Sequence, residues 1–183
     1  MAKRKTKKCR ICKDSFEVFN SLQFTCSAKC ALIWAKKDLE KKRKKEHKEA
    51  KERVKTRGEW IREAQAEFNR YVRLRDKDLG CICCGCTTSD DDLLTGSRWD
   101  AGHYLSVGAR PNLRFNEDNC HKQSVKCNRN LSGNAAAYRI ELVKKIGIER
   151  VEALECDHKP KSYTIEDIKE IKRRYKQKCK ELK

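Results

Sequence analysis

Hydrophobic residues recur at helical spacing in three parts of the chain. In residues 58–79 they fall three and four positions apart, which predicts a helix with one apolar face, ended by Gly80. Further helices are predicted near 134–146, which Asn134 would cap, and at 164–182, with Thr164 as N-cap and Asp167 three residues on. The apolar positions of the first and last helices suit packing against other helices; they are Trp60, Ile61, Ala64, Phe68, Tyr71 and Val72, and Ile168, Ile171, Tyr175, Cys179 and Leu182.

Two segments lack this pattern. Residues 36–57 hold twelve Lys/Arg and five Asp/Glu with almost no apolar position, which is typical of a solvated helix or a flexible basic connector. Residues 81–134 are rich in Cys, Gly, Asn and Asp, which favours loops with short strands. We therefore expect an N-terminal domain over 1–35, a basic helical linker over 36–57 and a second domain over 58–183.

Apolar material for a core is thin in this chain of 183 residues. Only 38% of the residues are hydrophobic, twelve cysteines included, whereas 39% are charged, so something else must help to hold the fold together. The uncharged stretches are too short to cross a membrane, and the basic N-terminus has no apolar run behind it. We expect a cytoplasmic protein, whose reduced cysteines bind metals more often than they form disulfides.

The chain is strongly basic, with 45 Lys+Arg against 27 Asp+Glu and a formal charge of +18. Such a charge favours a nucleic-acid partner, because neutralising phosphates releases counterions and drives binding. The alternative is a protein whose lysine-rich helical faces serve only its solubility.

The first cysteine cluster has the spacing of a four-thiolate zinc site. Cys9 and Cys12 form one close pair, and Cys26 and Cys30 form another after thirteen residues. A β-hairpin is expected between the pairs in FEVFNSLQF, and a helix after the second pair. This order predicts a treble-clef-like zinc finger, which either grips DNA or only folds the N-terminus.

The second cysteine cluster is less regular. Cys81, Cys83, Cys84 and Cys86 form two overlapping C-x-x-C pairs, and Cys120 and Cys127 follow much later. Cys127 is expected to be a third ligand because it precedes a predicted helix. The fourth ligand is left open by the spacing among Cys120, Cys83, Cys86 and His121.

The stretch between these cysteines, WDAGHYLSVGARPNLRFNEDNCHKQSVKCNRNLSGN, resembles the HNH, or ββα-metal, nuclease motif. The order CxxCG, DAGHY, LRFNEDN, HKQ, CN, SGN and YRIELVKKIG is similar to the NinG/Rap family of phage recombination endonucleases, which cut branched DNA such as Holliday junctions and D-loops. The resemblance implies an α+β fold: a small zinc-stabilised ββα-metal core flanked by α-helices, after the N-terminal finger.

The resemblance also assigns catalytic roles. His103 matches the first histidine of the motif, Asn119 the central asparagine that orients it, and Asn128 the last position. Phosphodiester hydrolysis needs a base and a cation, and an imidazole with an ordinary pKa of about 6.5 can accept a proton at cellular pH. The expected Mg²⁺ ligands are Asp100, Asn128 and His121, and Mn²⁺ is expected to substitute for Mg²⁺.

One position departs from the motif. The pair of cysteines that closes an HNH zinc site would stand at 124 and 127, but residue 124 is Ser124. We therefore assign the second zinc to Cys81, Cys84, Cys120 and Cys127, which gives about two zinc ions per chain.

Branched DNA is the expected partner. Its phosphates would meet basic residues near the motif and in the linker, namely Arg110, Arg114, Arg129, Lys42, Arg43 and Lys44. Two incisions suggest a homodimer, and phage recombination proteins are further expected partners. The alternatives are a non-catalytic zinc-finger DNA-binding accessory protein and an RNA-binding or ribosome-associated zinc protein. Neither needs the set Asp100, His103, Asn119 and Asn128, so the enzyme is favoured.

Overall fold

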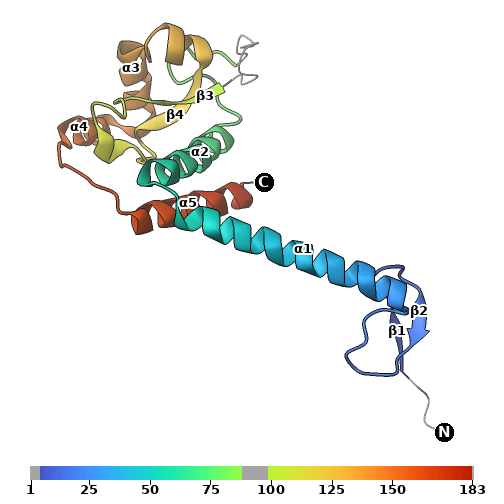
Figure 1. Ribbon diagram of the computed structural model, residues 1–183. Helices are drawn as coiled ribbons and strands as arrows, with labels where there is room; N and C mark the ends of the chain where they lie inside the picture. The colour runs from blue at the N-terminus through green and yellow to red at the C-terminus, as the bar shows by residue number, and fades with distance from the viewer. Residues whose placement is uncertain (1–4, 88–98, 183) are drawn as a thin grey trace. The chain divides into compact units, whose positions relative to one another are not determined.

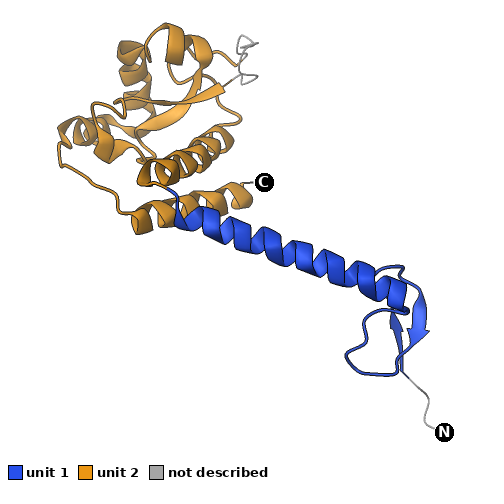
Figure 2. Cartoon of the chain, viewed as in Figure 1, with its two compact units in different colours: residues 1–55 blue, residues 56–183 orange. Residues whose placement is uncertain are grey.

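The computed structural model describes residues 5–87 and 99–182 and has a mixed α/β fold. The chain divides into two compact units, residues 1–55 and 56–183 (Figure 2). Within the described residues, no helix combines the length and the apolar character that crossing a membrane requires.

A short hairpin opens the first unit. Strand β1 (Thr6–Lys8) pairs antiparallel with β2 (Ser15–Glu17), and the Cys9–Cys12 turn connects them. The hairpin predicted in FEVFNSLQF is therefore wrong, because the partner of β2 precedes the first cysteine pair. Downstream of β2 the chain turns instead, since Asn20 and Gln23 side-chain oxygens accept hydrogen bonds from the backbone amides of Leu22 and Phe19.

Helix α1 (Ala28–Arg53) forms the rest of the first unit. Its N-cap is Ser27, whose hydroxyl accepts a hydrogen bond from the Cys30 amide. None of its residues is buried. Ion pairs one turn apart, such as Lys42–Asp38 and Lys44–Glu40, stabilise it weakly. Most of the predicted basic linker is thus part of one long solvated helix.

Helices α2 (Arg57–Arg75) and α5 (Ile165–Glu181) lie side by side in the second unit (Figure 1). Each begins with a capping box, Thr56–Glu59 and Thr164–Asp167, as the sequence predicts for α5. The predicted apolar faces are confirmed, except that Ile61 is half-buried and Leu182 is exposed. Their buried residues are Trp60, Ala64, Phe68, Tyr71 and Val72 in α2, and Ile168, Ile171, Tyr175 and Cys179 in α5.

Helix α2 ends at Arg75, five residues before the glycine that was expected to end it. The reason is Asp76, which is only 2% exposed and accepts hydrogen bonds from the Arg75 guanidinium and from the Lys122 amide. These bonds fix the C-cap of α2 against β4. Gly80 has another role, because a Cβ at this position would overlap the carbonyl of Gly85.

A second hairpin lies between two helical layers. Strand β3 (Trp99–His103) pairs antiparallel with β4 (Cys120–Ser124), and His103 stands opposite Cys120. Helix α2 packs on one face of the hairpin, while a short π-helical turn, η2 (Lys126–Asn130), and α3 (Ala135–Ile146) cover the other (Figure 1).

Two features of the α3 region differ from expectation. Asn134 stands directly before α3 with φ of 47°, but its side chain makes no capping hydrogen bond. Helix α4 (Ile148–Cys156) was not predicted; it follows Gly147, whose φ of 89° suits glycine, and buries Val151 and Leu154. The helix has only 9 residues and two buried positions, too few to establish a helical period in the sequence.

Candidate active site

Strand β3 presents its candidate residues to opposite faces of the hairpin. Asp100 and His103 stand three positions apart, and side chains alternate along a strand. Contacts agree with this alternation: the His103 ring lies 6.1 Å from the Phe68 ring of α2, whereas the Asp100 carboxylate accepts a hydrogen bond from Asn128 of η2 at 2.9 Å.

The loop between the strands fixes the tautomer of His103. Its Nε2 lies 2.9 Å from the backbone carbonyl of Arg114. A carbonyl oxygen only accepts hydrogen bonds, so Nε2 carries the proton and Nδ1 keeps a lone pair. Burial lowers the pKa of His103, so the ring is neutral near pH 7. Its Nδ1 lies 3.8 Å from the Cys120 thiol, whose pKa is raised by burial.

Asn119 holds the two ends of that loop together. Its side chain is fully buried; its Oδ1 accepts from the Leu105 amide at 2.8 Å, and its Nδ2 donates to the Leu105 and Leu113 carbonyls at 3.0 and 3.3 Å. Leu105 follows His103 by two residues, and Leu113 directly precedes Arg114. Asn119 therefore positions His103 through the backbone rather than through the ring.

Arg129 forms a salt bridge with the carboxylate of Asp100. Its Nε and Nη2 atoms donate to the two Asp100 oxygens at 2.9 and 3.0 Å, a bidentate pair beside the Asn128 amide. The carboxylate of Asp100 and the amide oxygen of Asn128 are ligands of the kind that Mg²⁺ takes. The donor set thus fits a divalent cation, provided that Arg129 releases Asp100.

His121 belongs to a structural chain of hydrogen bonds. Its ring is 3% exposed, and its Nδ1 lies 3.2 Å from the Tyr138 hydroxyl, which donates to the Gly102 carbonyl at 3.0 Å. Burial lowers the pKa of His121 to about 3, so it is neutral. None of the contacts described for His121 involves Asp100 or Asn128, so the geometry does not bring it to the predicted cation site.

The first cysteine cluster assembles as the spacing predicts. The sulfur atoms of Cys9, Cys12, Cys26 and Cys30 all lie within 4.8 Å of one another, close enough to share one metal ion. Tetrahedral four-thiolate coordination is what zinc prefers in structural sites. These four residues could therefore hold a zinc ion.

Three of the four residues assigned to the second zinc also gather, namely Cys81, Cys84 and Cys127, within 4.8 Å of one another. Cys120 is a correction. It is buried in the hydrophobic core to which α2 and α5 also contribute, four residues and about 13 Å along β4 from Ser124. The Ser124 end of β4 is the one near the cluster, since the Ser124 amide donates to the Cys81 sulfur at 3.3 Å.

Two further thiols adjoin this cluster. The Cys86 sulfur lies 3.2 Å from that of Cys84. Cys83 lies outside the three-thiol group but beside Cys81: its sulfur accepts from the Gln123 amide at 2.9 Å and lies 3.6 Å from the Gly133 carbonyl. The side-chain hydrogen bond with Cys83 is the main reason that the pKa of Cys81 is lowered, which favours the thiolate that binds metals.

The predicted DNA-binding residues fall in both units. Arg114 is half-buried and donates to Gln65 at 3.3 Å, and Arg110 lies 3.4 Å from His158. Lys42, Arg43 and Lys44 are exposed on α1. Residues 1–55 hold 19 Lys+Arg and 7 Asp+Glu, so two thirds of the net charge lies in the smaller unit.

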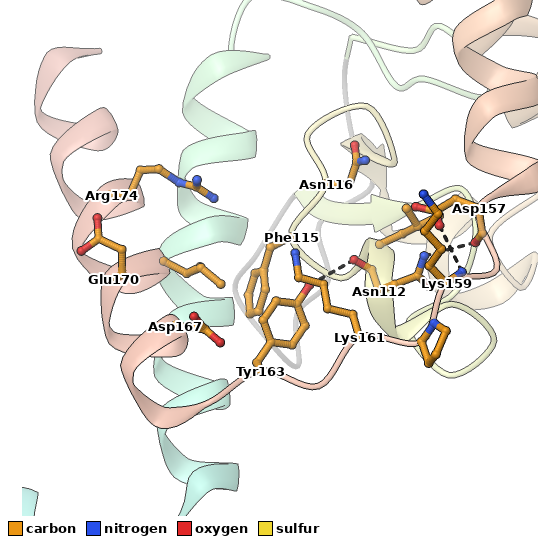
Figure 3. A pocket seen from close by; sticks show the side chains of 13 residues that line it. Asn112, Phe115, Asn116, Asp157, Lys159, Lys161, Tyr163, Asp167, Glu170 and Arg174 are labelled. Atoms are coloured by element: carbon orange, nitrogen blue, oxygen red, sulfur yellow. Dashed lines mark hydrogen bonds between the residues drawn. The ribbon is translucent and has the colours of Figure 1, made fainter.

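A pocket of about 640 Å³ lies beside the loop that holds His103 (Figure 3). Its walls come from residues 112–116, the connector 157–163 and the first half of α5. Phe115 and Tyr163 contact edge to face in it, with ring centroids 5.4 Å apart. Sequence reasoning missed this pocket, because its walls are far apart in the chain and share no motif.

Comparison with known proteins identifies the family. The family model described as "Bacteriophage Lambda NinG protein" matches residues 1–183. The chain belongs to the NinG family. It is 40% identical to protein ninG of Escherichia phage 933W and 39% identical to protein ninG of Escherichia phage lambda, covering 100% of this chain and 96% of each relative. Protein ninG of Salmonella phage P22 is 39% identical over 100% of this chain and 97% of its own length. No solved structure matches the chain.

Membership in the NinG family agrees with the resemblance found in the motif order. The match extends over the N-terminal cysteine cluster and α1 as well as the hairpin unit. Both units are therefore shared features of this phage family and its relatives.

Proposed function

We propose that this NinG family protein is a metal-dependent endonuclease that cuts branched DNA, with His103 as its general base. The observation that carries the proposal is the hydrogen bond between His103 Nε2 and the Arg114 carbonyl. It leaves Nδ1 as the basic atom of a neutral ring. The order of the elements supports it too: a strand ending in histidine, an asparagine before the second strand, and then a helical turn.

The reaction step follows from that tautomer. A water molecule at Nδ1 gives its proton to the ring while its oxygen attacks the phosphorus atom. The bond to the leaving oxygen then breaks, and that oxygen is protonated from solvent. Asn119 keeps the ring in place through the loop it clamps.

Asp100 and Asn128 are the residues that would hold Mg²⁺ or Mn²⁺. When bound, the cation supplies positive charge to phosphate oxygens. Asp100 and His103 face opposite sides of the hairpin. We therefore assign the cation site of Asp100 and Asn128 to binding the DNA backbone rather than to activating water. Arg129, once displaced from Asp100, becomes available to a phosphate.

The proposed DNA substrate and protein partners are inferred from the charge and from the family resemblance. A charge of +18 suits a DNA backbone partner, and residues of both units contribute to it. Paired incision of a four-way junction suggests a homodimer that works with phage recombination proteins in the host cytoplasm.

The test uses a synthetic four-way junction, a linear duplex and a single strand, each with and without Mg²⁺. We expect wild-type protein to cut the junction only with Mg²⁺, and His103→Ala to be slower by about 100-fold or more. The control is His47→Ala on α1, an exposed histidine that should change nothing. Equal cutting by wild type and His103→Ala would remove His103 from the reaction.

A non-catalytic DNA-binding zinc protein is the second candidate. The observation that favours it is that His103 Nδ1 faces a buried thiol while Arg129 holds both Asp100 oxygens. This candidate predicts that wild type and His103→Ala bind the junction equally and that neither cuts it. The same experiment therefore separates the two functions.

A further inference from the structure

We propose that Cys86 is the fourth ligand of the second zinc, together with Cys81, Cys84 and Cys127. The sulfur of Cys86 lies 3.2 Å from that of Cys84, which already belongs to the three-thiol group. Sulfurs that share a tetrahedral zinc lie about 3.8 Å apart, because each Zn–S bond is about 2.3 Å long. Cys86 is already beside Cys84, and completing the tetrahedron requires its sulfur to move closer to the rest of the group, which without it comprises Cys81, Cys84 and Cys127.

The backbone of residues 81–86 brings this thiol to the cluster. The Cys81 amide donates to the Cys86 carbonyl and the Gly85 amide donates to the Cys81 carbonyl, each at 2.8 Å. Gly85 has a φ of 69°, which glycine adopts without strain. The closed turn keeps Cys84 and Cys86 on the same side.

The other candidates are engaged elsewhere. Ser124 supports the cluster from outside, because its amide donates to Cys81 and its hydroxyl accepts from the Cys127 amide at 3.2 Å. Cys83 contacts Gln123 and Gly133 and hydrogen-bonds Cys81 from outside the three-thiol group, and Cys120 lies at the far end of β4. Cys86 therefore takes over the ligand role that Ser124 cannot fill.

The test measures zinc per chain after purification and dialysis against a weak chelator. Wild type should hold about two zinc ions, Cys86→Ala about one, and Cys83→Ala and Cys120→Ala about two. Since Cys86→Ala could fail to fold, the decisive variant is Cys86→Ala/Ser124→Cys, which places a cysteine at position 124. It should regain the second zinc. Two zinc ions in Cys86→Ala would overturn the proposal, as would failure of the double variant to regain the metal.

A different observation carries a second inference, which rests on the proposed action on DNA. We infer that the pocket beside the His103 loop holds an unpaired nucleotide of the DNA strand (Figure 3). Its carboxylates are already engaged: Asp157 accepts from the Lys159 amide, Asp167 caps α5, and Glu170 pairs with Arg173.

The cations of the pocket are available by contrast. Lys159, Lys161 and Arg174 form no salt bridge with a carboxylate among the residues that the structure describes, and Lys161 acts on Asp167 only at longer range, helping to lower its pKa. Lys161 lies 5.0 Å from the Tyr163 ring centre, so an ammonium group and an aromatic surface stand together. This combination suits a phosphate and a base that are bound side by side.

The position of the pocket favours a DNA strand over a free nucleotide. Leu113 and Phe115 line it and flank Arg114, whose carbonyl holds His103. A strand with one nucleotide in the pocket would continue past the candidate base. A D-loop or an opened branch point supplies unpaired nucleotides, whereas intact duplex does not.

Fluorescence anisotropy in EDTA tests this without requiring cleavage. The probes are a labelled single-stranded oligonucleotide and the same strand with abasic sites. Wild type should prefer the complete strand by about tenfold, since one stacked base contributes about 1–3 kcal/mol. The variant Lys159→Ala/Lys161→Ala/Arg174→Ala should lose both affinity and that preference. The matched control, Arg62→Ala/Lys176→Ala/Lys180→Ala, removes the same charge from α2 and α5 and should keep the preference.

Equal losses in the two triple variants would overturn the pocket and leave only general charge. Tighter binding of the matching RNA, or equally tight binding of a nucleoside monophosphate, would also overturn it. His103→Ala should bind the strand as wild type does. The binding result can therefore be interpreted even if the protein proves not to cut DNA.

Discussion

The Tyr138 hydroxyl links the buried ring of His121 to the Gly102 carbonyl, with 3.2 Å on the histidine side and 3.0 Å on the carbonyl side. The hydroxyl donates to the carbonyl, so it must accept from His121 Nδ1. Strand β4 is thereby joined through α3 to strand β3. The ring stays neutral because it is buried, not because the hydrogen bond requires it.

His121 should therefore make stability fall in acid. Its pKa is lowered to about 3, mainly by burial, whereas the unfolded chain binds a proton at about 6.5. The unfolded state thus holds more protons below pH 6.5, and stability is lost as the pH falls from there. Between pH 7 and pH 5 we expect a loss of about 2 kcal/mol from this residue, measured by urea unfolding. His121→Asn, which can still donate to Tyr138, should reduce the slope by this amount, and an unchanged slope would contradict the assignment.

Asn119→Ala should be severely destabilising. The change leaves the Leu105 amide and the Leu105 and Leu113 carbonyls without their partner in a fully buried site. We expect a cost of about 3 kcal/mol in urea unfolding. Asn130→Ala, at an exposed position in η2, is the control and should be close to neutral. A loss below about 1 kcal/mol for Asn119→Ala would mean that water replaces the clamp.

Gly102→Ala tests the packing between the strands. A Cβ at residue 102 would overlap the Oε1 of Gln123, which is itself buried without a hydrogen-bond partner among the described atoms. We expect a cost of about 2 kcal/mol in thermal or urea unfolding. In a Gln123→Ala background the same change should cost almost nothing, because the obstructing atom is gone. Equal costs in both backgrounds would rule out this overlap as the cause.

Asp76→Asn tests the charged group that ends α2. Burial disfavours the carboxylate, yet Arg75, the Lys122 amide and Lys145 together lower its pKa. Stability from this group is present above its unfolded pKa of about 3.9 and is lost as the pH falls through the lowered value. We expect Asp76→Asn to cost about 3–5 kcal/mol at pH 7, because it leaves Arg75 uncompensated. Asp78→Asn, at an exposed carboxylate, should be neutral in the same urea titration.

The helices were predictable where one face is buried along the whole length. In α5 the buried residues Ile168, Ile171 and Tyr175 keep the helical period, and Thr164 and Asp167 mark the start. The end of α2 was not predictable, since a buried contact of Asp76 with β4 decides it. Local spacing cannot report a partner that is 46 residues away.

In the candidate site, too, features set by local spacing were predictable and those set by long-range contacts were not. Cys9, Cys12, Cys26 and Cys30 form two local pairs, so their spacing is enough to predict the cluster. The position of Cys120 depends on the register of β4 and on Cys81 lying near the Ser124 end of that strand. Neither can be derived from the cysteine spacing. The placement of Asp100 and His103 on opposite faces could have been predicted from the sequence, because residues three positions apart on one strand point to opposite sides.

Helix α1 has consequences for how this chain can change. None of its 26 residues is buried, and the side chains that have a specific partner in the first cysteine cluster or on Phe24 are Cys30 and Trp34, both near its start. Substitutions that keep helix propensity and positive charge should be accepted at most positions after Trp34. In α2, by contrast, five buried positions each admit few alternatives. Over evolutionary time α1 is where the sequence can drift fastest, while its length and charge persist.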